Sequence, residues 1–152
     1  MIQRIQSVWL LCASIALLLL LVVPIIGNVQ ETSAFWIRAT GLYQQTNGAT
    51  SKIDSYTPLT ISVIAVSVMA LAIIFNFKRR TLQKRMILFL IALISSVSFW
   101  MFNYAQKIPG GLESASYKAG VSLPLIAIAF CILAVRGIAK DERLLRSAER
   151  LR

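Results

Sequence analysis

The sequence predicts an all-α membrane protein: four transmembrane helices in an antiparallel bundle, with a short outer β-hairpin and a cytoplasmic amphipathic C-terminal helix. Hydrophobic residues make up 57% of the 152 residues, mean hydropathy is +0.72, and only 14% of residues are charged. A soluble domain of this size would lack the polar residues needed to cover its surface. The apolar residues also gather in four runs, each near the roughly 20 residues that cross a bilayer as a helix. We therefore predict a single integral membrane domain over residues 1–152.

The first predicted span covers residues 5–26, and Arg4 precedes it as in a signal peptide. A cleavable signal has an apolar core of about 7–15 residues followed by an A-x-A-like cleavage site. This run is longer, and the residues from Pro24 to Asn28 contain no such site. We interpret the run as an uncleaved membrane anchor.

The outer loop at residues 27–57 contains the signals of a β-hairpin. Aromatic residues such as Trp36 and Tyr43 favour strands. Asn47 and Gly48 form the commonest hairpin turn signal, because both residues tolerate positive φ. The predicted arms are residues 34–45 and 50–56. An isolated hairpin is marginal in water, so we expect it to rest on the outer end of the helices. The alternative, a loop without fixed structure, stays open.

The other three spans follow from the remaining apolar runs and the residues at their ends. Pro58 suits the first position of a helix, where its missing N–H would be unpaired anyway. Trp100 and Tyr104 lie at one end of the third run, where an aromatic belt is typical. Pro124 falls in the first turns of the last run and predicts a modest kink. The predicted spans are residues 58–77, 86–104 and 119–138, joined by a cytoplasmic loop at 78–85 and an outer loop at 105–118.

The tail at residues 139–152 has the pattern of an amphipathic helix. Leu144, Ala148 and Leu151 fall on one helical face, and arginines follow the acidic start of the segment. We expect this helix to lie on the membrane surface. Whether it continues the last span past Gly137 stays open.

Lys and Arg are unequally divided between the two ends of the predicted helices. Arg4, the five in 78–85 and the six from Arg136 onward lie on one side, against four on the other. Each side carries three acids. The positive-inside rule then places both termini in the cytoplasm and the loop at 27–57 outside.

Several functional classes are excluded by residues that the sequence lacks. It contains no histidine, and its two cysteines fall inside apolar runs, so we expect neither a metal site nor a disulfide. No ionisable residue lies in the middle of a predicted span, which argues against proton-coupled transport. No catalytic, nucleotide-binding or cofactor motif occurs. We attribute the net charge of +10 to membrane orientation and anionic lipid head groups, not to nucleic acid.

Two sets of residues are candidates for packing or interaction. Small and hydroxyl residues, several spaced four apart, let helix backbones approach closely, and the serines of the third span are the best candidates for an interhelical hydrogen-bond cluster. The candidate packing residues are Cys12, Ala16, Ala92, Ser95, Ser96, Ser98, Ala127 and Cys131. Exposed aromatic, apolar and basic residues of the outer loop and tail are candidates for partner binding. These are Trp36, Leu42, Tyr43, Arg143, Leu144, Arg146 and Leu151.

Both ends of the chain are similar to a known family. The start MIQRIQSVWLL and the ending RGIAKDERLLRSAERLR resemble DUF4293, a bacterial family found in Bacteroidetes. The resemblance covers the whole chain and implies a four-span protein of the bacterial inner membrane. It implies no site residues.

The sequence therefore favours a non-enzymatic integral membrane protein, an accessory or scaffolding subunit of a larger membrane complex. The alternative is a small transporter or channel subunit that acts as an oligomer, with the serines as its polar lining. An enzyme built on Glu31, Asp54 and Glu113 is the least favoured class, because isolated loop carboxylates are usually solvated charges.

Overall fold

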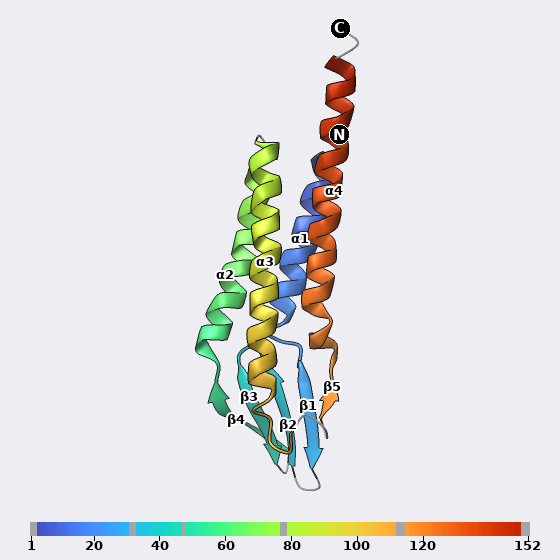
Figure 1. Cartoon of the computed structure of the whole chain (residues 1–152). Coiled ribbons are helices and arrows are strands. Elements are labelled where there is room, and N and C mark those ends of the chain that lie inside the picture. The colour runs from blue at the N-terminus through green and yellow to red at the C-terminus, as the bar shows by residue number, and fades with distance from the viewer. Residues whose placement is uncertain (1–2, 31–32, 47, 77–78, 112–114, 150–152) are drawn as a thin grey trace.

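Four helices stand side by side, and a β-sheet extends from one end of them (Figure 1). The computed structural model describes residues 3–30, 33–46, 48–76, 79–111 and 115–149. The helices are α1 (Gln3–Leu19), α2 (Thr57–Phe75), α3 (Arg80–Ala105) and α4 (Leu123–Glu149), with the short 3₁₀ helix η1 (Ala119–Val121) before α4. The strands are β1 (Ile26–Gln30), β2 (Ser33–Arg38), β3 (Gly41–Thr46), β4 (Ala49–Ser55) and β5 (Ser116–Tyr117).

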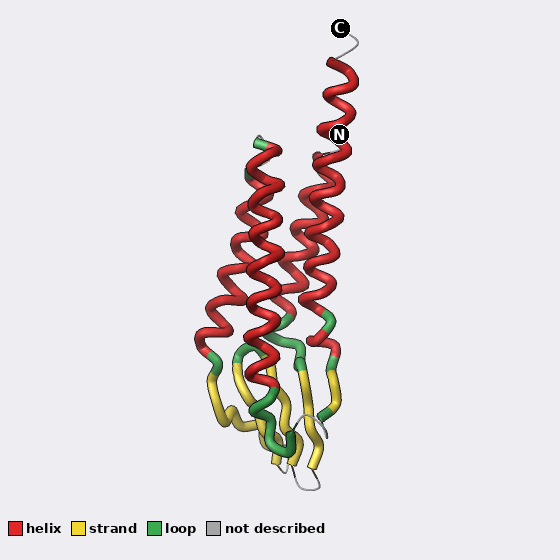
Figure 2. The backbone as a smooth tube through the Cα atoms, viewed as in Figure 1, coloured by secondary structure: helices red, strands yellow, loops and turns green. Residues whose placement is uncertain are grey.

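The prediction of an all-α fold with a single hairpin is wrong. The chain forms a five-stranded antiparallel sheet in the order β4-β3-β2-β1-β5. The predicted arm at 34–45 is two strands, because the chain turns at Ala39 and Thr40 before β3. Thr46 pairs with Ala49, so a two-residue connection joins β3 and β4 at the predicted turn. Figure 2 shows the strands confined to the end of the molecule away from both termini.

The first helix ends earlier than the sequence suggested. α1 stops at Leu19, a turn follows, and the chain is already in β1 at Ile26. Pro24 accounts for the change, because proline lacks the N–H that a helix needs and pushes the preceding residue towards extended geometry. The apolar run predicted as one span is thus a helix and the start of a strand.

In the part of the chain that the structure describes, three helical segments are long and apolar enough to cross a membrane. They are Thr57–Phe75, Thr81–Ala105 and Ala119–Arg143, and the apolar helix Ile5–Leu19 is shorter. α4 runs without a break through Gly137 to Glu149 and extends past the other helices (Figure 2). The predicted tail is therefore a continuation of α4 and not a separate helix.

The helices pack in a ring in which α1 contacts α2 and α4, and α3 contacts the same two helices. Their buried faces carry mostly aliphatic residues, and these continue into the buried face of the sheet without a gap. Fully buried large side chains in this core include Leu10, Leu17, Leu59, Ile73, Leu90, Ile94 and Ile138 from the helices and Ile37 from the sheet.

Backbone hydrogen bonds attach the sheet to the helix ends. Ala39 donates to the carbonyl of Leu20 at 3.3 Å, just beyond α1. Gly120 donates to the carbonyl of Pro24 at 3.1 Å, and Lys118 donates to Ile25 at 2.9 Å. The sheet is consequently a fixed extension of the helices.

Candidate functional site on the outer sheet

The two faces of the sheet differ because side chains alternate along each strand. Phe35 and Ile37 point into the core, and Leu42, which pairs with Ile37, is also buried. Asn28 lies on the same side and donates from Nδ2 to the carbonyl of Pro109 at 2.8 Å. The segment after α3 therefore covers this face, as Figure 1 also shows.

The opposite face gathers aromatic rings and cations. Trp36 and Tyr43 are cross-strand partners, and their rings stack with centroids 6.5 Å apart. The guanidinium of Arg38 lies 5.2 Å from the centroid of the Tyr43 ring, and the ammonium of Lys52 lies 6.0 Å from it. Lys118 reaches the same face over β1. We call these five residues, Trp36, Arg38, Tyr43, Lys52 and Lys118, the cationic face.

Tyrosines fix the junction between the covered side of the sheet and the helices. The Tyr56 and Tyr104 rings stack with centroids 4.1 Å apart, and Tyr56 is 2% exposed. Burial raises the pKa of the Tyr56 phenol, and Asp54 and Tyr104 raise it further. The phenol is therefore neutral at physiological pH and acts in packing.

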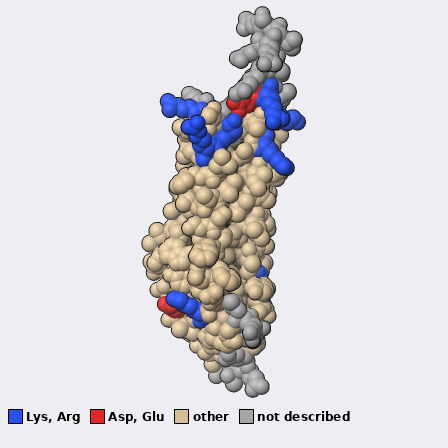
Figure 3. Space-filling view, in the orientation of Figure 1, with Lys and Arg blue, Asp and Glu red and all other residues tan. Residues whose placement is uncertain are grey.

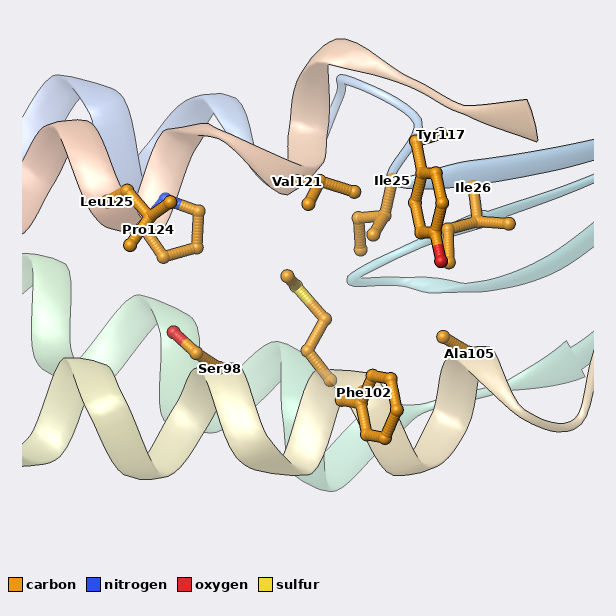
Figure 4. A pocket seen from close by; sticks show the side chains of 10 residues that line it. Ile25, Ile26, Ser98, Phe102, Ala105, Tyr117, Val121, Pro124 and Leu125 are labelled. Atoms are coloured by element: carbon orange, nitrogen blue, oxygen red, sulfur yellow. The ribbon is translucent and has the colours of Figure 1, made fainter. Parts of the chain in front are cut away.

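A separate apolar cavity of about 180 Å³ lies between α3 and α4 where they meet the sheet. Ser98, Phe102 and Ala105 line it from α3, and Pro124 and Leu125 face them from α4 (Figure 4). Ile25, Ile26, Val121 and Tyr117 close it at the sheet end. Its walls offer little hydrogen bonding, so it is suited to an apolar group and not to a polar substrate.

The far end of the helices is strongly basic and is held by polar contacts between helices. On the face shown in Figure 3, many Lys and Arg side chains lie at the end of the helices remote from the sheet, and fewer lie at the sheet. Lys84 of α3 forms an ion pair with Glu142 of α4. Gln6 of α1 donates to Asp141, which is 8% exposed. These contacts tie α1 and α3 to the same turn of α4.

The structure places the predicted packing residues in different surroundings. Ala127 and Cys131 are fully buried in α4, Ala16 is buried in α1, and Cys12 is half-buried. The remaining candidates lie on α3: Ala92, Ser95 and Ser96 are exposed, and Ser98 is half-buried.

The serines of α3 do not form the predicted cluster. Ser95 donates to Ile91 and Ser98 donates to Ile94, both within α3. A serine does bond between helices elsewhere: Ser14 Oγ of α1 donates to the backbone carbonyl of Ser67 in α2 at 3.1 Å. The hydroxyl of Ser67 donates within α2, to the carbonyl of Val63 at 2.8 Å, so only the serine of α1 contributes a side chain to this bond. Ser14 was not among the predicted packing residues.

The residues predicted to bind a partner do not form one surface in the structure. Trp36 and Tyr43 share the cationic face, whereas Leu42 is 7% exposed on the covered face. Arg143 is exposed near the end of α4, far from the sheet. Leu144 and Arg146 belong to the last turns of α4, whose side chains lie outside the described set, and Leu151 lies outside the described residues.

Arg38 and Lys118 were not among the predicted interaction residues, although Arg38 carried a usable signal. It follows Trp36 by two residues in a predicted strand, so the two share a face. Lys118 gave no comparable signal, because its position depends on β5 pairing with a strand far away in the sequence.

Among the described residues, no group of three or more His, Cys, Asp or Glu side chains is placed to hold a metal ion. No curated protein matches the chain. A family model described as a domain of unknown function, DUF4293, matches residues 2–151. Since the match covers nearly the whole chain, the protein belongs to the DUF4293 family.

Proposed function

We propose that the chain is an integral protein of the bacterial inner membrane that crosses it four times. α1 supports a fourth span, because its outward face is apolar and exposed. Ile5, Val8 and Ile15 are 56%, 53% and 49% exposed on the surface of α1. A helix that shows such side chains to its surroundings is stable in hydrocarbon. Its 17 residues rise about 25 Å, and the apolar turn after Leu19 adds to that length.

The charge distribution supports an orientation with both termini in the cytoplasm. The described Lys84, Arg85 and Lys140 lie at the end remote from the sheet, together with the exposed Arg79 and Arg136. Cytoplasmic ends are rich in Lys and Arg. The sheet then stands on the outer side of the membrane.

Within this topology the chain acts as a non-enzymatic accessory or scaffolding subunit of a membrane complex. The observation that carries this proposal is the cationic face, where Trp36 and Tyr43 stack without being buried in the core. Stacked aromatic residues beside arginine are the side chains that contribute most at protein interfaces. The sheet has one face for its own core and a second face suited to a membrane-protein partner.

Purification from native membranes tests the subunit role. We expect the wild-type chain to retain a stoichiometric partner after chemical crosslinking, and the double variant Trp36→Ala, Tyr43→Ala to lose it. Gln45→Ala is the matched control, because Gln45 is an exposed residue of the same strand as Tyr43 and lies further along it. A monodisperse lone chain from wild-type membranes, with no crosslinked product, would count against a subunit role.

The second candidate function is a small transporter or channel subunit. A groove of about 290 Å³ between α2 and α3 supports it, because Ser62 and Ser96 lie among its lining residues. Most of the other lining residues are apolar, so the groove supports transport less strongly than the cationic face supports the subunit role. Solute flux into liposomes that is lost in Ser62→Ala and Ser96→Ala variants would raise it above the subunit role.

A further inference from the structure

The cationic face includes a small cavity at the junction of sheet and helices. It measures about 180 Å³ and lies beside β1 and β2. The residues that line it are Pro24, Gly27, Val29, Ala34, Phe35, Trp36, Arg38 and Lys118. Gly27 makes room for the cation: a Cβ at this position would lie 3.2 Å from Cε of Lys118. The side chain of Lys118 therefore packs flat across β1.

The polar side chains that line this cavity, those of Trp36, Arg38 and Lys118, carry hydrogen-bond donors. Nε1 of Trp36 and Nε of Arg38 are both buried and have no partner among the described residues. Trp, Arg and Lys side chains can donate hydrogen bonds but cannot accept them. Buried N–H groups are normally paired, so this arrangement favours a ligand that supplies oxygen acceptors.

The positive charges of the cationic face favour a negatively charged ligand. Arg38, Lys52 and Lys118 bring three positive charges to the cationic face, and none forms an ion pair with a described acid. The one described acid of the sheet, Asp54, pairs with the buried Leu42 and accepts from the backbone N–H of Ser55. The guanidinium of Arg38 lies over the Tyr43 ring, and a guanidinium is well suited to a phosphate, which it can contact through two parallel hydrogen bonds.

The position of the cavity indicates where the phosphate comes from. Arg38 is followed by Ala39, which is bonded to the end of α1, and Lys118 lies two residues before Gly120, which is bonded to Pro24. Both cations thus lie beside the ends of the helices, and in the proposed topology this position is at the depth of the phospholipid head groups.

We propose that Trp36, Arg38 and Lys118 form a binding site for a phosphate group, supplied by a phospholipid of the outer leaflet. Arg38 and Lys118 neutralise the charge, and the indole N–H of Trp36 donates to a phosphate oxygen. The inference uses the proposed orientation of the sheet but does not depend on the subunit role. Free inorganic phosphate has the same chemistry and is the alternative source.

Ligand binding to the purified full-length chain tests the site. Trp9→Phe and Trp100→Phe leave Trp36 as the single tryptophan, whose emission reports on the cavity. The protein, in a phosphate-free detergent, is titrated with a short-chain phosphatidylglycerol, with the diacylglycerol of the same chain length, and with inorganic phosphate. We expect saturable binding of phosphatidylglycerol and none of the diacylglycerol.

Substitutions locate the binding. Arg38→Gln and Lys118→Gln are each expected to weaken phosphatidylglycerol binding about tenfold, as loss of a charge-assisted hydrogen bond does. Lys107→Gln is the matched control. The ammonium of Lys107 lies 5.1 Å from the centroid of the Tyr104 ring and does not belong to the cationic face. An unchanged thermal midpoint in both site variants shows that they remain folded.

The outcomes distinguish a lipid phosphate from free phosphate, and they test the phosphate site separately from the subunit role. Inorganic phosphate that binds as tightly as the lipid supports the site and assigns free phosphate as its ligand. Equal binding of phosphatidylglycerol and diacylglycerol, or equal binding by Arg38→Gln and wild type, would overturn the site. The binding assay uses the purified chain without a partner protein, so its result is independent of the subunit role. That role is tested by crosslinking in native membranes.

Discussion

Gly41→Ala is expected to disrupt the sheet more than any other single-methyl change at its glycines. Gly41 begins β3 with φ of +152°, and a Cβ there would lie 2.2 Å from the carbonyl oxygen of Asp54. A real Cβ cannot come so close, so β3 and β4 must separate. Overpacking and backbone strain together predict a loss of about 3 kcal/mol or more in the free energy of unfolding.

Thermal unfolding in detergent, followed by tryptophan emission, measures this loss. Gly48→Ala is the matched control, because Gly48 also has positive φ, at +83°, but a Cβ added there would meet no atom within 4 Å. It should lose only about 1 kcal/mol, from the left-handed conformation. Equal midpoints for the two variants would mean that β3 and β4 are not held together as described.

Ile37→Ala is the second change with a large expected effect. Ile37 is fully buried and pairs with Ile26 on one side and Leu42 on the other. Its carbonyl also accepts from the N–H of Ile25 at 2.8 Å, so it lies where sheet and helices join. Removing its side chain leaves a cavity in this shared core and should cost about 2–5 kcal/mol.

Ile53→Ala provides the comparison for Ile37. Ile53 is 52% exposed and lies at the register shift between β3 and β4. Its truncation should cost about 0.5 kcal/mol, as is usual at the surface. A small effect at Ile37 in the same unfolding assay would show that the sheet does not share its core with the helices.

The apolar runs predicted the positions of α2 and α3 and the existence of α1 and α4, because a long apolar helix gives a long and continuous signal. The sheet was underestimated for the opposite reason. β1 begins at the end of the run counted as the first span and β5 has only two residues, so no strand pattern marks them. Their pairing depends on contacts between distant segments, which local propensity does not report. β4 (Ala49–Ser55), in contrast, coincides with the predicted arm at 50–56.

The candidate site was predictable only in part. Trp36 and Tyr43 were identified from their residue type, but Leu42 was grouped with them although neighbouring residues of a strand point to opposite faces. Arg38 shares the face of Trp36 by simple alternation. Lys118 could not be placed, because β5 brings it to β1 across most of the chain.

The central claim is that the sheet and the basic helix ends lie on opposite sides of the membrane, and cysteine labelling tests it most directly. In a chain carrying Cys12→Ala and Cys131→Ala, a single cysteine replaces either Thr50, exposed on β4, or Arg79, exposed before α3. A membrane-impermeant maleimide added to intact spheroplasts should label Thr50→Cys at once and Arg79→Cys only after the membrane is broken. Labelling of both cysteines in intact spheroplasts would contradict the proposed orientation and the outer-leaflet position of the phosphate site.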